Sequence, residues 1–126
     1  MANLKFAVLG TGFRSHFQIP AWFEVGGVEL VALYNRTVAK AEAVAAKFGV
    51  PRVYGDAEEL FQNEQLDFVD IITEVPAHAP LVMLAAKYKV PVICQKPMAA
   101  DFATCEAMVR ACQDAGIPFN IHENFR

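Results

Sequence analysis

A chain of 126 residues, of which 55% are hydrophobic and 20% charged, has enough apolar side chains to bury the core of one domain and too many to be disordered. Its net charge of −3 and the lack of a basic run exclude an extended nucleic-acid surface. The longest clean apolar stretch, 79–86, is far shorter than the roughly twenty residues of a membrane span, and the amino-terminal residues lack the apolar core of a signal peptide. The sequence therefore predicts a soluble cytoplasmic domain.

Segments of strand length alternate with segments of helical periodicity along the whole chain. We expect strands at residues 4–9, 28–34, 52–54, 68–73, 90–94 and 119–122. Between them we expect helices at residues 13–24, 37–48, 78–89 and 101–115, and a further helix that Asp56 caps together with Glu59. Pro20 is expected either to kink the first helix or to mark its true first turn.

Strands that are apolar on both faces and separated by helices indicate an α/β fold, a doubly wound parallel sheet with helices on both faces. Right-handed crossovers favour the strand order 3-2-1-4-5-6 of the Rossmann fold. Ligands in such sheets bind at the carboxyl ends of the strands, so the segments that follow the strands, 10–15, 35–37, 73–78 and 95–98, are the candidates for a site.

A glycine-rich turn, Gly-Thr-Gly-Phe-Arg-Ser, follows the first strand and opens the first helix. The first glycine permits a tight turn, the second lets the backbone approach a pyrophosphate, and the helix end offers free N–H groups. Ser15 replaces the usual third glycine and is still small. Methyltransferases also place glycines here, so the motif alone does not name the cofactor. We expect the dinucleotide to contact Gly10, Thr11, Gly12, Phe13 and Arg14.

The end of the second strand reads Asn35-Arg36-Thr37, with Lys40 one turn on. An enzyme specific for NAD would place Asp or Glu here against the adenosine ribose. Without that carboxylate, Arg36 is free to bond a 2′-phosphate or to stack on adenine, which favours NADP over NAD. The alternative is that Arg36 is a solvated residue at a helix start.

Gln95-Lys96-Pro97 follows the fifth strand. A lysine fixed there by a following proline would project toward the position expected for the nicotinamide, where its ammonium could hold a substrate oxygen. Taken alone, this lysine is more readily explained as an exposed residue at a turn than as a catalytic group.

These residues together resemble the glucose–fructose oxidoreductase, inositol dehydrogenase and rhizopine-catabolism (Gfo/Idh/MocA) group of NAD(P)-dependent oxidoreductases. The resemblance covers the whole chain. It implies that Lys96 acts beside the nicotinamide as a catalytic residue and that the Lys96–Pro97 peptide is cis. It also implies a cofactor site that includes Gln95, Lys96 and Pro97. The residues that carry it are Gly10-Thr11-Gly12, Thr73, His78, Gln95-Lys96-Pro97 and Glu123-Asn124-Phe125-Arg126.

Two positions depart from the pattern of this family. Gln95 stands where the family has Glu, which keeps a hydrogen-bonding amide and removes a negative charge near the lysine. After Thr73 the chain has Glu74-Val75 where Pro-Asn is usual, so cofactor contacts from that asparagine are in question. His78 either lies near the ribose or makes a local bond at a helix start.

The resemblance also implies a second, mainly antiparallel β-sheet domain that would follow residue 126 and hold most of the substrate. We expect hydride transfer between NADP or NAD and a sugar, polyol or related hydroxy or carbonyl compound, by a homo-oligomer. A non-catalytic dinucleotide sensor or regulatory module is the alternative, and a methyltransferase is a weaker third. The scattered histidines and cysteines predict neither a metal site nor a disulfide.

Overall fold

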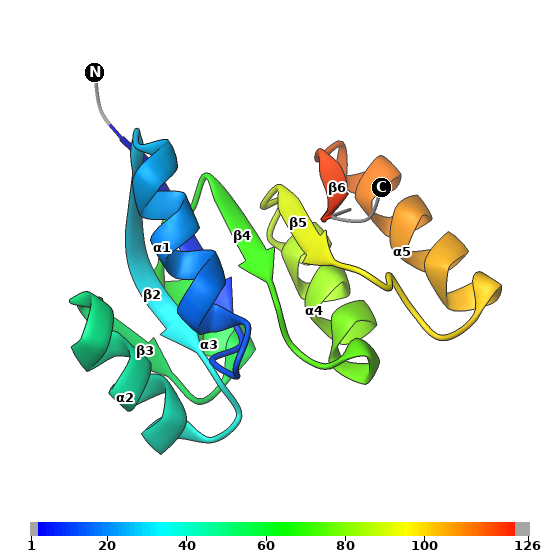
Figure 1. Cartoon of the computed structure of the whole chain (residues 1–126). Helices are drawn as coiled ribbons and strands as arrows, with labels where there is room; N and C mark the ends of the chain where they lie inside the picture. The colour runs from blue at the N-terminus through cyan, green and yellow to red at the C-terminus, as the bar shows by residue number, and fades with distance from the viewer. Residues whose placement is uncertain (1–2, 123–126) are drawn as a thin grey trace.

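Over residues 3–122, which the computed structural model describes, six strands form one parallel sheet in the order β3-β2-β1-β4-β5-β6 (Figure 1). The predicted doubly wound sheet and its strand order are confirmed. The strands are β1 (Leu4–Leu9), β2 (Val28–Tyr34), β3 (Arg52–Tyr54), β4 (Phe68–Ile71), β5 (Val92–Gln95) and β6 (Phe119–His122).

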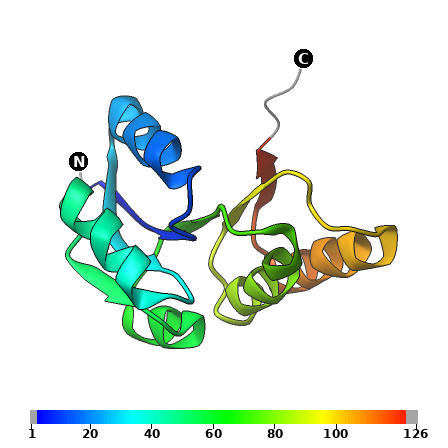
Figure 2. The same cartoon turned by 60° about the horizontal axis from the view of Figure 1, so that its bottom comes forward.

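Helices cover both faces of the sheet, as the two-sided apolar strands predict. One core lies under α1 (Ser15–Val25) and α2 (Val38–Phe48), where Ile19 and Val44 meet Phe6 and Val8. Figure 2 shows α1 on the opposite side of the sheet from α4 and α5. Each fully buried aliphatic side chain contributes about 1.5–3 kcal/mol to folding. The other core lies under α3 (Ala57–Asn63), α4 (Val75–Lys87) and α5 (Phe102–Ala115).

The fourth helix differs from expectation at its start. Helix α4 begins at Val75 and not at residue 78, directly after Glu74, whose backbone is extended (φ −65°, ψ 154°). Pro76 lies in the first turn of the helix, where a missing N–H costs no hydrogen bond. His78 is therefore about one turn inside the helix and not at its start.

The first helix also differs from expectation. Helix α1 begins at Ser15 because residues 13 and 14 still belong to the tight turn, in which the Ser15 amide donates to the Gly12 carbonyl. Pro20 lies inside α1 and does not mark its first turn. The predicted Asp56 cap of α3 is confirmed, since its carboxylate accepts a hydrogen bond at 3.0 Å, from the Glu58 amide and not from that of Glu59.

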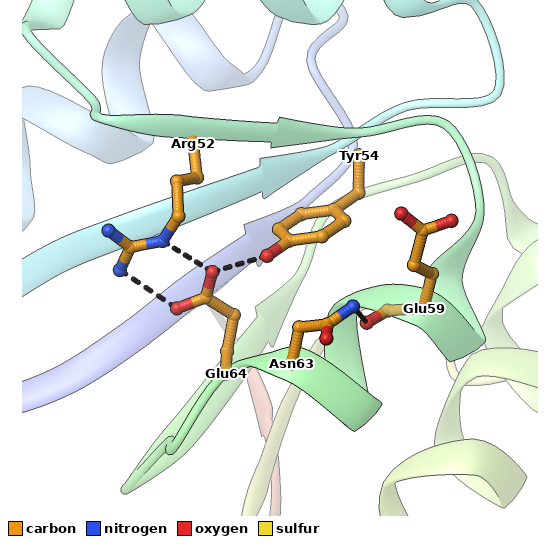
Figure 3. A network of polar contacts seen from close by, with 5 residues as sticks. All are labelled: Arg52, Tyr54, Glu59, Asn63 and Glu64. Carbon is orange, nitrogen blue, oxygen red and sulfur yellow. Dashed lines mark hydrogen bonds and ion pairs between the residues drawn. The ribbon is translucent and has the colours of Figure 1, made fainter.

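A polar cluster joins the edge strand β3 to the end of α3 (Figure 3). The Glu64 carboxylate accepts hydrogen bonds from the Arg52 guanidinium (Nη2 at 2.9 Å) and from the Tyr54 hydroxyl (2.6 Å). Burial, followed by the bond to Glu64, raises the pKa of Tyr54 to about 12. Burial alone would raise the pKa of Glu64, but the bonds from Arg52 and Tyr54 outweigh it and hold that pKa below its usual value.

We expect Glu64→Gln to lower the free energy of unfolding at pH 7 by about 1–3 kcal/mol, since a charged acceptor of three hydrogen bonds is lost. A carboxyl whose pKa is lowered in the folded state stabilises it above the unfolded-state pKa, and this contribution disappears as pH falls through the folded-state value. The gap between wild type and variant should therefore shrink below about pH 4. Urea unfolding at several pH values, with the exposed Glu59→Gln as control, measures it. Equal midpoints at pH 7 would show that the cluster is not stabilising.

Candidate functional site

A cavity of about 520 Å³ opens at the carboxyl ends of β1, β2 and β4, as expected for this fold. Residues from all three strand ends line it. Those predicted from the sequence are Gly10, Thr11, Gly12, Phe13, Arg14, Asn35, Arg36, Thr37 and Thr73. Glu74, Pro76 and Ala77 also line it and belong to the candidate segment 73–78, although none was singled out as a site residue. Tyr34, Lys40 and Ile72 lie outside the predicted segments, at the same edge of the sheet.

Gly10 brings the turn after β1 against the end of β4. Its φ of 117° is a conformation that L side chains rarely adopt. A Cβ atom at this position would lie 2.9 Å from the Thr73 nitrogen and 3.0 Å from the Ile72 carbonyl carbon, both of them rigid backbone. The glycine is thus required for the contact between the two loops.

The remaining turn residues fit an anionic group at the start of α1. A Cβ atom at Gly12 would meet no atom of the described residues within 4 Å, so the backbone there faces open space. The Thr11 hydroxyl is buried and has no hydrogen-bond partner within residues 3–122, which leaves it available to a ligand. Ser15 is fully buried and its hydroxyl donates to the Gly12 carbonyl at 2.6 Å, which holds the turn. These features suit the pyrophosphate of a dinucleotide.

The far side of the cavity carries charge of both signs. The Asn35 amide donates to the Thr37 carbonyl at 3.0 Å and closes the turn after β2. The Arg36 guanidinium is exposed and lies 4.0 Å from the carboxylate of Glu74, which follows β4. Glu74 is far from Arg36 in sequence and follows a different strand, so the residues around Arg36 do not by themselves predict this carboxylate.

The loop after β5 lies one strand beyond the lining of the cavity. Because β5 pairs with β4, Gln95, Lys96 and Pro97 stand at the same edge of the sheet as the cavity. The Lys96–Pro97 peptide is cis, as predicted. The buried Gln95 side chain turns back and accepts a hydrogen bond from the Lys96 amide at 3.1 Å, which fixes the start of this loop.

The structure does not bring His78 into the cavity lining. Its side chain is fully buried, and its ring nitrogens face the Thr73 carbonyl at 3.1 Å and the Pro97 carbonyl at 3.1 Å. Of the two alternatives, a place near the ribose or a local bond, the contacts of His78 with backbone carbonyls agree with the local bond. Its bonds reach both to a neighbouring residue and to the lysine loop.

Asp70 is a buried polar residue that the sequence analysis did not single out. It lies within the otherwise apolar β4 and is fully buried. Its carboxylate accepts hydrogen bonds from the Trp22 indole at 2.6 Å and the Gln18 amide at 3.0 Å, both on α1. Asp70 thereby ties the helix of the glycine turn to the centre of the sheet. A lone carboxylate inside an apolar strand was the signal in the sequence.

The described part of the chain gives no support for a metal site, a reactive thiol at Cys94 or a membrane-spanning helix. Among residues 3–122, no three His, Cys, Asp or Glu side chains gather in a way that could hold a metal ion. Cys94 precedes Gln95, and burial, followed by the charge of Asp70, raises the pKa of its thiol to about 12, as for a core residue. Over the same residues, no helix combines the length and apolarity needed to span a membrane.

The fold and the glycine turn together define a dinucleotide-binding Rossmann domain. Residues 4–122 match the family model described as "Oxidoreductase family, NAD-binding Rossmann fold". The chain belongs to this Gfo/Idh/MocA family, and the resemblance of the sequence is confirmed. The Glu123–Arg126 segment that contributed to the resemblance lies outside the described residues.

Comparison with known proteins gives relatives across the whole chain. D-apiose dehydrogenase of Rhizobium rhizogenes is 46% identical over 126 residues, which are 100% of this chain and 36% of that protein. D-xylose 1-dehydrogenase (NADP(+)) 2 of Haloferax volcanii is 36% identical over 90% of this chain and 35% of its own length. A crystal structure of an oxidoreductase from Agrobacterium radiobacter in complex with NAD+, L-tartaric acid and magnesium has a TM-score of 0.95 at 46% identity, covering 99% of this chain and 36% of that one. The chain thus spans about a third of the length of these relatives.

Proposed function

We propose that this domain binds the nicotinamide dinucleotide of an oxidoreductase that transfers hydride between the cofactor and a sugar or related polyol. The observation that carries the proposal is the turn at the start of α1, where a buried Thr11 hydroxyl without a hydrogen-bond partner among residues 3–122 stands beside the open backbone of Gly12. Curated relatives named as dehydrogenases of D-apiose and D-xylose favour an enzyme over a non-catalytic sensor, and an aldose over other substrates.

The dinucleotide would span the edge of the sheet. Its pyrophosphate would lie against Gly12 and Thr11, its adenosine toward Arg36 at the end of β2, and its nicotinamide toward the ends of β4 and β5. The bound cofactor supplies a ring carbon that gives or takes hydride. Lys96 would then hold the reacting substrate oxygen by a charge-assisted hydrogen bond and stabilise the negative charge that develops on it.

The substrate would be held mainly by a further domain, since the chain spans about a third of the length of its relatives. The sheet supports this. Within residues 3–122, no helix covers β5 and β6 on the side of α1, where Ile93 is half-buried and Asn120 is exposed. Parallel sheets are normally covered on both faces, so this face is available to a further domain.

We also propose that the complete enzyme is cytoplasmic and a homo-oligomer.

For the adenosine end we propose a preference for NADP over NAD, with Arg36 bonding the 2′-phosphate. Arg36→Ala should remove most of the difference in Kd between the two cofactors, a loss of about 1.5–3 kcal/mol for NADP alone. The phosphate must compete with Glu74 for the guanidinium, so Glu74→Gln should widen the preference. Calorimetric titration measures both, and Arg110→Ala, the same charge change on α5, serves as control. Equal Kd values in wild type, unchanged by Arg36→Ala, would refute this assignment.

A further inference from the structure

The His78 ring joins the loops that follow two neighbouring strands. It lies on α4 with its side chain fully buried. Its Nε2 atom is 3.1 Å from the carbonyl oxygen of Thr73, in the loop after β4. Its Nδ1 atom is 3.1 Å from the carbonyl oxygen of Pro97 and 3.2 Å from that of Met98, in the loop after β5. One side chain thus bridges the cavity loop and the lysine loop.

The chemistry of the partners fixes what the ring must do. All three oxygens belong to backbone carbonyls, which only accept hydrogen bonds, so each contact needs a ring nitrogen that carries a proton. A neutral imidazole can donate toward one loop and a protonated imidazole toward both. The contact with the lysine loop therefore requires a proton on Nδ1 of His78.

The bridge lies in a continuous series of contacts from the phosphate end of the site to the lysine. Gly10 packs on the backbone of Thr73 so closely that a Cβ atom there would lie 2.9 Å from the Thr73 nitrogen. The Thr73 carbonyl lies 3.1 Å from Nε2 of His78, and Nδ1 of the same ring lies 3.1 Å from the carbonyl of Pro97, the residue after Lys96. A shift of the lysine loop relative to the glycine turn would therefore break a buried hydrogen bond.

We propose that His78 is a positioning residue that holds the Lys96 loop in register with the dinucleotide turn, through Nδ1–H bonds to the carbonyls of Pro97 and Met98. It touches neither cofactor nor substrate and acts through the backbone on either side of it. The proposal rests on the proposed function for the role of Lys96, whereas the link between the loops does not depend on it.

Two conservative variants separate the two ends of the bridge. The amide nitrogen of asparagine lies close to where the Nδ1 atom of histidine stands, and that of glutamine close to Nε2. His78→Asn should therefore keep the bond to the lysine loop, and His78→Gln should lose it. We expect hydrogen–deuterium exchange of segment 95–100 to be roughly five- to tenfold faster in His78→Gln and close to wild type in His78→Asn. Val82→Ala, equally buried on α4 but purely apolar, should not loosen this segment selectively.

The second readout is kinetic and uses the complete enzyme. His78→Gln should lower kcat roughly ten- to a hundredfold with little change in dinucleotide Kd, and His78→Asn should restore most of it. Equal exchange in the two variants, or wild-type kcat in His78→Gln, would overturn the proposal. If neither variant folds, the ring 15N shifts of the wild-type chain decide, since an Nδ1 without a proton excludes the link. A wild-type enzyme that transfers no hydride would refute the proposed function while leaving the exchange and nitrogen data to judge the bridge.

Discussion

Replacing Lys96 with methionine is expected to lower the rate of hydride transfer by about a hundredfold or more, because one preorganised charged donor to the reacting oxygen is removed. Methionine keeps an unbranched chain of similar length, so the loop after the cis Lys96–Pro97 peptide should keep its course. The Kd of the dinucleotide should change much less, since the lysine lies outside the cavity that the glycine turn lines.

The measurement needs a protein in which this domain is joined to a substrate domain of the length found in the relatives. Steady-state rates with an aldose and binding titrations with the dinucleotide are compared for Lys96→Met and for Lys5→Met, an exposed lysine at the start of β1. Full activity of Lys96→Met would mean that this lysine has only a structural role.

Gly12→Ala is expected to weaken dinucleotide binding by roughly ten- to a hundredfold, or about 1.4–2.7 kcal/mol, while leaving the fold intact. The added methyl group meets no atom of residues 3–122 within 4 Å, so it costs the folded chain little, yet it enters the space where a pyrophosphate would approach the backbone. Gly10→Ala provides the contrast. Its methyl group would strike the backbone of Thr73 at a φ of 117°, so this variant should lose stability as well.

Thermal unfolding and calorimetric titration of both variants separate the two roles. If Gly12→Ala bound the dinucleotide with wild-type affinity, the pyrophosphate would not lie against this turn. A loss of stability in Gly12→Ala as large as that in Gly10→Ala would show that the space beside Gly12 serves the fold and not a ligand.

The sheet could be predicted well because its signal is local and repeated. The structure places β1 and β2 at the predicted bounds, 4–9 and 28–34, and residues 6–9 and 30–33 within them are buried on both faces. The start of α4 was missed because Glu74-Val75-Pro76 was interpreted as a loop, although a proline is well suited to the first turn of a helix. Helix ends are decided by single hydrogen bonds, which periodicity does not report.

The glycine turn and the end of β2 were predicted as site residues because each is contiguous in sequence and follows a strand. The contacts that join different loops and elements around the site were not predicted. The Glu74 carboxylate beside Arg36, the Trp22 indole on Asp70 and the Pro97 and Met98 carbonyls at His78 all come from segments distant in sequence. Such contacts depend on how the strands are ordered and how the loops meet at one edge, so one sequence alone does not specify them.

Titration of this chain with NADP+, NAD+ and S-adenosylmethionine in parallel tests most directly whether the turn at Gly10–Gly12 is a dinucleotide site. We expect both dinucleotides to bind, NADP+ more tightly, S-adenosylmethionine not to bind detectably, and Gly12→Ala to weaken both dinucleotides together. Because the proposed substrate pocket lies mainly in a further domain, the same chain should bind dinucleotide without measurable hydride transfer to an aldose. Failure of both dinucleotides to bind a folded chain, or binding that Gly12→Ala leaves unchanged, would contradict the account.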